Sequence, residues 1–166
     1  MSTVSKFVTC LWFDGVAEEA AKYYVGIFEG SSKITRVTHF GNEGQEIHGQ
    51  KPGSVLTVAF ELNGMSFTAL NGGPQFKFNE AISVQVMCET QAEIDRLWEK
   101  LSAGGDPKAQ QCGWLKDKYG LSWQIVPSLM SEWMDDGDRA KADRVMKAFL
   151  PMKKLDIAKL KQVAAG

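Results

Sequence analysis

The chain has 166 residues, of which 19 are basic and 20 acidic, so its net charge at pH 7 is −1. This length can bury a hydrophobic core as one domain without structural metal or disulfide bonds. Because the charged residues are spread along the chain, we expect no nucleic acid and no membrane as partners. No segment reaches the roughly 20 apolar residues that span a bilayer, and we expect no secretory leader, because residues 1–6 lack a basic leader and an apolar stretch. The three cysteines form no Cys-x-x-Cys pair, which favours a reducing compartment, and we predict a cytoplasmic protein.

The first half of the chain predicts one strand, one helix and three further strands. Residues 6–13 alternate as a strand does, and apolar residues recur at three- and four-residue steps in 17–28, which indicates a helix. Asn63-Gly64 is a strong signal for a tight hairpin. The three further strands are expected at 33–40, 54–62 and 65–70.

The same order begins again in the second half. Residues 82–88 alternate like a strand, and an amphipathic helix follows at 90–101. A polar loop at Pro107 then leads to two closing strands, expected at 112–116 and 121–126. Residues 64–70 and 120–126 share one pattern: turn glycine, apolar, serine, aromatic, polar, apolar, apolar. Chance similarity between two hairpin strands is the alternative explanation.

We interpret the repeated order as duplication of one supersecondary unit. The predicted fold class is α+β, with two βαβββ modules that form a cupped mixed sheet and a C-terminal helical extension. One domain is expected over 1–166, divided into module one at 1–75, module two at 76–127 and a helical tail at 128–166.

The tail predicts three short helices. An apolar stripe lies at 129–134, Asp138 can cap a second helix that Pro151 ends, and a third helix is expected at 157–163. Their apolar stripes need a surface to cover, either the open face of the sheet or a second subunit. We favour the simpler interpretation that the tail is a packing appendage.

Alternation divides the strand side chains between two faces of the sheet. One face is apolar and suits packing under the two helices; it would hold Val8, Cys10, Trp12, Phe67, Ala69, Val84, Val86, Cys88, Trp123 and Ile125. The other face carries hydroxyl, amide and apolar groups and no charge; it would hold Thr9, Leu11, Phe13, Ser66, Thr68, Leu70, Ser83, Gln85, Met87, Ser122, Gln124 and Val126. Such a composition suits an enclosed cavity with a few hydrogen-bonding groups. Burial of this face by a partner subunit or by the tail is the alternative.

Four strings of residues carry a resemblance to a known family. They are Leu11-Trp-Phe-Asp-Gly, Ala17-Glu-Glu-Ala, Gly113-Trp-Leu-Lys-Asp and Trp123-Gln-Ile-Val-Pro. With the repeated order of elements, they resemble the vicinal oxygen chelate superfamily. More narrowly, the chain is similar to its PhnB-like branch, often labelled 3-demethylubiquinone-9 3-methyltransferase domain proteins. Relatives by fold include glyoxalase I, extradiol dioxygenases and the bleomycin and fosfomycin resistance proteins, so the fold alone leaves the function open.

The resemblance implies where a metal would bind. Enzymes of this superfamily hold one divalent metal with a His or Glu from each of four strands, and the matching positions here are Thr9, Thr68, Ser83 and Gln124. Neutral hydroxyls and amides are poor ligands for Zn²⁺, Fe²⁺ or Ni²⁺. We therefore predict no metal at these positions and no cofactor.

Other candidate groups have structural explanations. His39 and His48 lack partners at ligand spacing, and Asp117 beside Gly120 is expected to be a turn residue. The segment 71–74 follows a strand but opens no helix and lacks the G-x-G-x-x-G spacing. It is thus a poor cradle for S-adenosylmethionine, which argues against the methyltransferase activity of the family label.

Our leading hypothesis is a protein that binds a small apolar or aromatic molecule in a metal-free cavity of the sheet. The residues expected to line this cavity are Thr9, Phe13, Thr68, Ser83, Gln85, Met87, Trp114 and Gln124. One alternative is a glyoxalase- or dioxygenase-type enzyme with non-standard metal or acid–base residues; the methyltransferase activity and an interaction module are the others. The resemblance and the apolar stripes of the tail also predict a homodimer.

Overall fold

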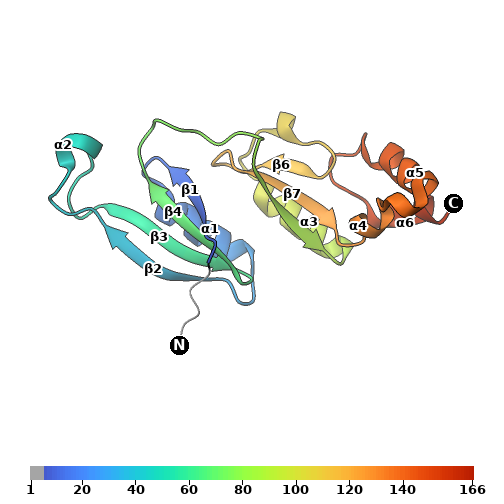
Figure 1. The fold of residues 1–166 in the computed structure, drawn as a ribbon, viewed down its shortest axis with the longest axis horizontal. Coiled ribbons are helices and arrows are strands. Elements are labelled where there is room, and N and C mark those ends of the chain that lie inside the picture. The colour runs from blue at the N-terminus through green and yellow to red at the C-terminus, as the bar shows by residue number, and fades with distance from the viewer. Residues whose placement is uncertain (1–5) are drawn as a thin grey trace. The chain divides into compact units, whose positions relative to one another are not determined.

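The computed structural model describes residues 6–166 and consists of two compact units, divided between Lys77 and Phe78 (Figure 1). The helical tail belongs to unit two. Within the described residues, no helix is both long enough and apolar enough to span a bilayer.

Unit one confirms the predicted order of one strand, one helix and three strands. Its elements are β1 (Thr9–Phe13), α1 (Ala17–Ile27), β2 (Lys33–His39), α2 (Gln45–His48), β3 (Val55–Leu62) and β4 (Met65–Asn71). The strand order in the sheet is β1-β4-β3-β2, with β1 parallel to β4 and the other neighbours antiparallel. The short helix α2 lies in the connection between β2 and β3. Asn63 and Gly64 have φ values of 46° and 89°, as the predicted tight hairpin requires.

Helix α1 packs on one face of this sheet. The ring of Tyr24 stacks on Phe60 with centroids 6.2 Å apart, and Phe60 stacks on Phe67 at 5.2 Å. Val16, at the N-terminus of α1, provides no side-chain cap. Instead Asn71, at the end of β4, accepts a hydrogen bond from the backbone N–H of Ala17 at 2.9 Å, so a distant side chain satisfies one of the unpaired N–H groups of the helix.

The face predicted for the first strand was wrong. In β1, Leu11 and Phe13 are buried and Cys10 is exposed. Leu11 is paired with Ala69, and paired residues of neighbouring strands point to the same side of a sheet. Leu11 and Phe13 therefore face α1, and Cys10 lies on the opposite side. The residues of both sets are mostly apolar, so alternation alone could not choose between them.

Unit two also begins with a strand followed by a helix, but it has one strand fewer than unit one. Its elements are β5 (Ser83–Cys88), α3 (Gln91–Ser102), a 3₁₀ turn (Pro107–Ala109), β6 (Trp114–Lys116) and β7 (Ser122–Pro127). The sheet order is β5-β7-β6, with β5 parallel and β6 antiparallel to β7. The two closing strands were predicted, but among the described residues unit two has no counterpart of β2. Between α3 and β6 the chain instead passes close to the sheet, since a Cβ on Gly105 would lie 1.9 Å from the carbonyl oxygen of Lys116.

The tail forms α4 (Met130–Trp133), α5 (Arg139–Phe149) and α6 (Ile157–Ala165). Asp138 caps α5 as predicted. The tail packs on its own unit: Gln91 of α3 donates to the carbonyl of Leu155 at 3.1 Å and accepts from the N–H of Ile157 at 2.9 Å. The N–H of Cys112 also donates to the carbonyl of Met152 at 2.7 Å. These bonds agree with the interpretation of the tail as a packing appendage.

Candidate functional site

The face of the unit-two sheet opposite α3 brings together five of the predicted site residues. Pairing of β5 with β7 and of β7 with β6 places Gln85, Gln124 and Trp114 in one row. Ser83 and Met87 occupy the neighbouring rows on the same side. The predicted alternation of β5 and β7 is therefore confirmed.

Three of these side chains form a hydrogen-bonded chain. Gln124 donates from Nε2 to the hydroxyl of Ser83 at 2.8 Å, and Gln85 donates from Nε2 to Oε1 of Gln124 at 3.1 Å. The bonds fix the orientation of the Gln124 amide. The hydroxyl hydrogen of Ser83 and the carbonyl oxygen of Gln85 remain available, so the chain presents a donor at one end and an acceptor at the other.

Apolar groups flank this polar chain. Trp114 is half-buried, and Met87 is 52% exposed although it lies in a strand. Ser122, in the row of Ser83, is buried, and within the described part of the chain its hydroxyl has no hydrogen-bond partner. The face thus combines a hydrogen-bonded polar chain with accessible apolar side chains.

The expectation of a charge-free face needs one correction. Lys116 is paired with Ser122 and therefore lies on this face at the β6 edge. Its ammonium group forms an ion pair with Glu80. The hydrogen bond from Lys116 holds the pKa of Glu80 below its usual value. One charge is therefore present on the face and is paired.

Unit one separates the residues predicted to act together. Thr68 lies on the face opposite α1, where its neighbour on β1 is Cys10. Thr9 is paired with Phe67, in the core under α1, and Phe13 is 4% exposed. Thr9 and Phe13 are thus on the other side of the sheet from Thr68, and Cys10 occupies the position expected for Thr9.

The glycine segment after β4 supports Trp12. The indole N–H of Trp12 donates to the carbonyl of Gly73 at 2.8 Å, and its ring meets Phe76 edge-on with centroids 4.9 Å apart. The N–H groups of Gly72 and Gly73 both point to the carbonyl oxygen of Phe13, at 3.0 and 3.4 Å. Because these donors already have a partner within the chain, the segment does not form an anion cradle.

The histidines and Asp117 have structural surroundings. The ring of His48 packs on Phe40 at 4.6 Å and its Nδ1 accepts from the N–H of Gln50 at 2.9 Å. His39 lies on β2, the edge strand of its sheet. Asp117 is buried in the turn between β6 and β7, as expected for a turn residue. Among the described residues, no group of three His, Cys, Asp or Glu side chains is arranged to hold a metal ion.

The comparisons with known proteins agree with the resemblance found in the sequence. A family model described as 3-demethylubiquinone-9 3-methyltransferase matches residues 5–126. A PhnB protein from Bacillus cereus is 35% identical, with 74% of this chain and 99% of that chain covered and a TM-score of 0.62. No curated protein matches the chain.

Two further structures show the fold. Protein PA1353 from Pseudomonas aeruginosa is 18% identical, with 75% of this chain and 98% of that chain covered and a TM-score of 0.55. The fosfomycin resistance protein FosX from Listeria monocytogenes is 14% identical, with 81% and 99% covered and a TM-score of 0.50. On the family match and the 35% identical relative, the chain belongs to the 3-demethylubiquinone-9 3-methyltransferase family of PhnB-like proteins.

Proposed function

We propose that this protein binds a small, uncharged, partly aromatic molecule on the open face of the unit-two sheet. Ser83, Gln85 and Gln124 would orient the ligand, and Met87 and Trp114 would pack against it. Thr68 lies on the face of the unit-one sheet opposite α1, and we assign it no part in the unit-two site. Thr9 and Phe13 lie on the α1 side of their sheet, so we assign them no role in binding.

The observation that supports this proposal best is the chain of hydrogen bonds from Gln85 through Gln124 to Ser83. Side chains on a solvated sheet face lose conformational entropy when they are held in one arrangement. Here that arrangement leaves a donor and an acceptor in fixed positions. A planar neutral molecule with one hydroxyl or carbonyl group could use either, and its apolar part could cover Met87 and Trp114.

The residues favour binding over catalysis. General acid–base chemistry needs a His, Asp, Glu, Lys or Tyr within hydrogen-bond reach of the substrate. On this face the candidate is Lys116, which is paired with Glu80 at the β6 edge. The methyltransferase label of the family would also require a site for S-adenosylmethionine. The amides of Gly72 and Gly73, which could have formed one, are directed at Phe13.

A thermal-shift screen followed by calorimetry tests the proposal. The panel contains neutral phenols and quinones, including a 3-demethylubiquinone analogue, and S-adenosylmethionine. A ligand at 100 times its Kd stabilises the folded state by about 2.7 kcal/mol, which is visible as a shift of several degrees in Tm. Gln124→Ala should abolish the shift, whereas Gln45→Ala, at an exposed position on α2, should leave it unchanged. If no neutral compound stabilises the protein, or if Gln124→Ala binds as well as the parent chain, the proposal is wrong.

We also propose that a second copy of the chain covers the outer edges of β1 and β5. These strands lie at the ends of their sheets, and neither contains a charged residue. The strands at the other ends of the two sheets, β2 and β6, have features that protect natural sheets against unwanted strand pairing. Strand β2 carries Lys33 and Arg36 and has two irregularities in its register, and β6 is three residues long.

Light scattering after size-exclusion chromatography tests the homodimer. The parent chain should have the mass of a dimer, and Cys10→Lys on β1 should shift it to a monomer, because a charge on a strand edge opposes pairing. Thr35→Lys on β2 places the same charge on the already charged edge and should leave the dimer intact. A monomeric parent chain, or an equal effect of both variants, would contradict the proposal.

A further inference from the structure

The end of the chain is strongly basic. Residues 139–166 contain eight Lys and Arg residues and two Asp residues, for a net charge of +6, although the whole chain has a net charge of −1. Residues 1–138 therefore carry a net charge of −7. The even spread of charge that was expected from the composition does not hold for α5 and α6. A local excess of this size attracts anions to the surface that carries it.

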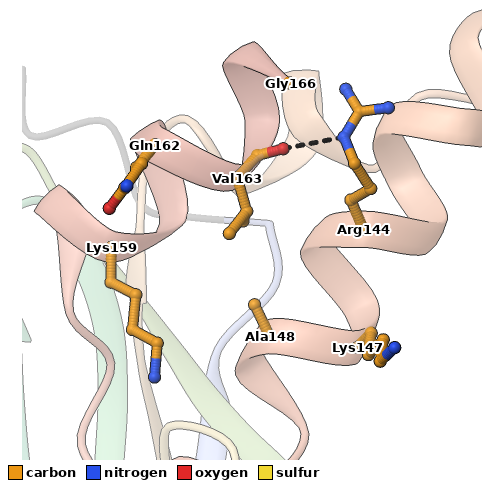
Figure 2. Close-up of a pocket in the computed structure, with 7 residues that line it drawn as sticks. All are labelled: Arg144, Lys147, Ala148, Lys159, Gln162, Val163 and Gly166. Atoms are coloured by element: carbon orange, nitrogen blue, oxygen red, sulfur yellow. Dashed lines mark hydrogen bonds between the residues drawn. The ribbon is translucent and has the colours of Figure 1, made fainter.

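A groove lies between these two helices. It has a volume of about 620 Å³ and is lined by Arg144, Lys147, Ala148, Lys159, Gln162, Val163 and Gly166. Figure 2 shows the side chains of Ala148 and Val163 directed toward each other between Lys159 on α6 and Arg144 on α5. The groove therefore has an apolar centre with cationic groups on both sides, and its volume is within the range of small-molecule sites.

Arg144 is held in place by α6. Its Nε donates to the carbonyl of Val163 at 2.9 Å (Figure 2). A second guanidinium nitrogen donates to the carbonyl of Ala164 at 3.2 Å. These carbonyls belong to the last turn of the helix, where they have no intrahelical partner. Both acceptors are neutral carbonyl groups, and the two bonds fix the guanidinium group of Arg144 at the groove.

The two lysines of the groove are also uncompensated. In the described residues, no carboxylate lies within ion-pair distance of Lys147 or Lys159. Other lysines of unit two do have such partners, for example Lys154, which is 2.6 Å from Asp95. Three cations thus surround one apolar groove, and a bound anion would pair with the two lysines, which have no ion-pair partner among the described residues.

We propose that the α5–α6 groove binds a small amphiphilic anion, a phosphate or carboxylate group attached to a short apolar body. The anionic group would contact Arg144 and the lysines, since guanidinium and ammonium groups form charge-assisted hydrogen bonds to such oxygens. The apolar body would cover Ala148 and Val163. This site is separate from the sheet face proposed for the neutral ligand and does not depend on it.

Calorimetry with octyl phosphate below its critical micelle concentration tests the inference, with inorganic phosphate and octanol as the anion-only and apolar-only probes. Octyl phosphate should bind at least tenfold more tightly than either. Lys147→Gln and Lys159→Gln should each weaken its binding about two- to fivefold, as expected for partly exposed charge pairs, and raising NaCl to 0.5 M should weaken it further. Lys161→Gln, on the same helix and outside the groove, is the matched control and should change the affinity less than twofold.

Three results would overturn the inference. The first is equal affinity for octyl phosphate in the double variant Lys147→Gln/Lys159→Gln and in the parent chain. The second is binding of inorganic phosphate as tight as that of octyl phosphate. The third is binding of duplex DNA or of anionic phosphatidylserine vesicles without binding of octyl phosphate, which would indicate a flat polyanion surface. Gln124→Ala should bind octyl phosphate normally, so failure of the sheet-face proposal can be recognised separately.

Discussion

The indole N–H of Trp123 donates a hydrogen bond to Oδ2 of Asp117 at 2.8 Å, and both side chains are buried. The other carboxylate oxygen, Oδ1, accepts from the N–H groups of Tyr119 at 2.8 Å and Leu121 at 3.1 Å. One carboxylate therefore satisfies a side-chain donor in the core and two backbone donors in the turn. It therefore connects the β6–β7 turn to Trp123, on the side of the unit-two sheet that faces α3. The candidate site lies on the other face of the same sheet.

Asp117→Asn should destabilise the protein by about 2 kcal/mol. The amide nitrogen of Asn would replace one carboxylate oxygen and would face an N–H group, so this buried donor would lose its acceptor. Urea denaturation followed by tryptophan fluorescence measures the change. Asp106→Asn is the control, since Asp106 caps an exposed 3₁₀ turn. A loss no larger in Asp117→Asn than in Asp106→Asn would show that the buried carboxylate is dispensable.

Asn71→Ala should destabilise unit one by about 2–3 kcal/mol. The side chain of Asn71 is 5% exposed, accepts from the N–H of Ala17 and donates to the carbonyl of Val55 at 3.0 Å. Its removal leaves a buried donor and a partly buried acceptor unpaired. Chemical denaturation gives the free energy of unfolding, and Asn79→Ala, an exposed turn position, should change it by less than about 0.5 kcal/mol.

Two glycine substitutions should change the stability of the protein in opposite directions. Gly26 lies in α1 with no atom within 4 Å of an added Cβ, so Gly26→Ala should stabilise the protein by about 0.5–1 kcal/mol. Gly105→Ala should destabilise it strongly, because its Cβ would overlap the backbone oxygen of Lys116. Thermal unfolding of both variants beside the parent chain measures the two effects, and a raised Tm in Gly105→Ala would contradict the close approach.

Cys88 should make stability fall at high pH. Burial raises the pKa of its thiol to about 12, from an ordinary value of 9.0. The unfolded chain therefore ionises first as pH rises, and the contribution to stability that is present below pH 9 is lost between pH 9 and 12. Comparing urea denaturation at pH 8 and pH 10 for the parent chain and for Cys88→Ala measures this, and the variant should show the smaller decrease. Iodoacetamide should modify Cys88 only after unfolding.

Local patterns predicted most of the elements. The hairpin at Asn63-Gly64, the cap at Asp138 and the helix-facing side of β5 were all confirmed, because each depends on residues near one another in sequence. The alternation of β5 could be assigned because hydroxyl and amide side chains occupy one side and valines the other. Gln85 and Gln124 could be placed on one face for the same reason, whereas the position of Trp114 beside Gln124 follows from the pairing of β6 with β7.

Only the tertiary structure decided the face of β1 and the role of Asn71. Both alternating sets of β1 are mostly apolar, so its orientation depends on the register with β4, which places Leu11 beside Ala69 and Cys10 beside Thr68. Asn71 caps a helix that begins 54 residues earlier in the chain. The register with the neighbouring strand decides which side of an apolar strand is buried, and a residue far along the chain can cap a helix only once the backbone has folded. A local sequence pattern therefore encodes neither feature.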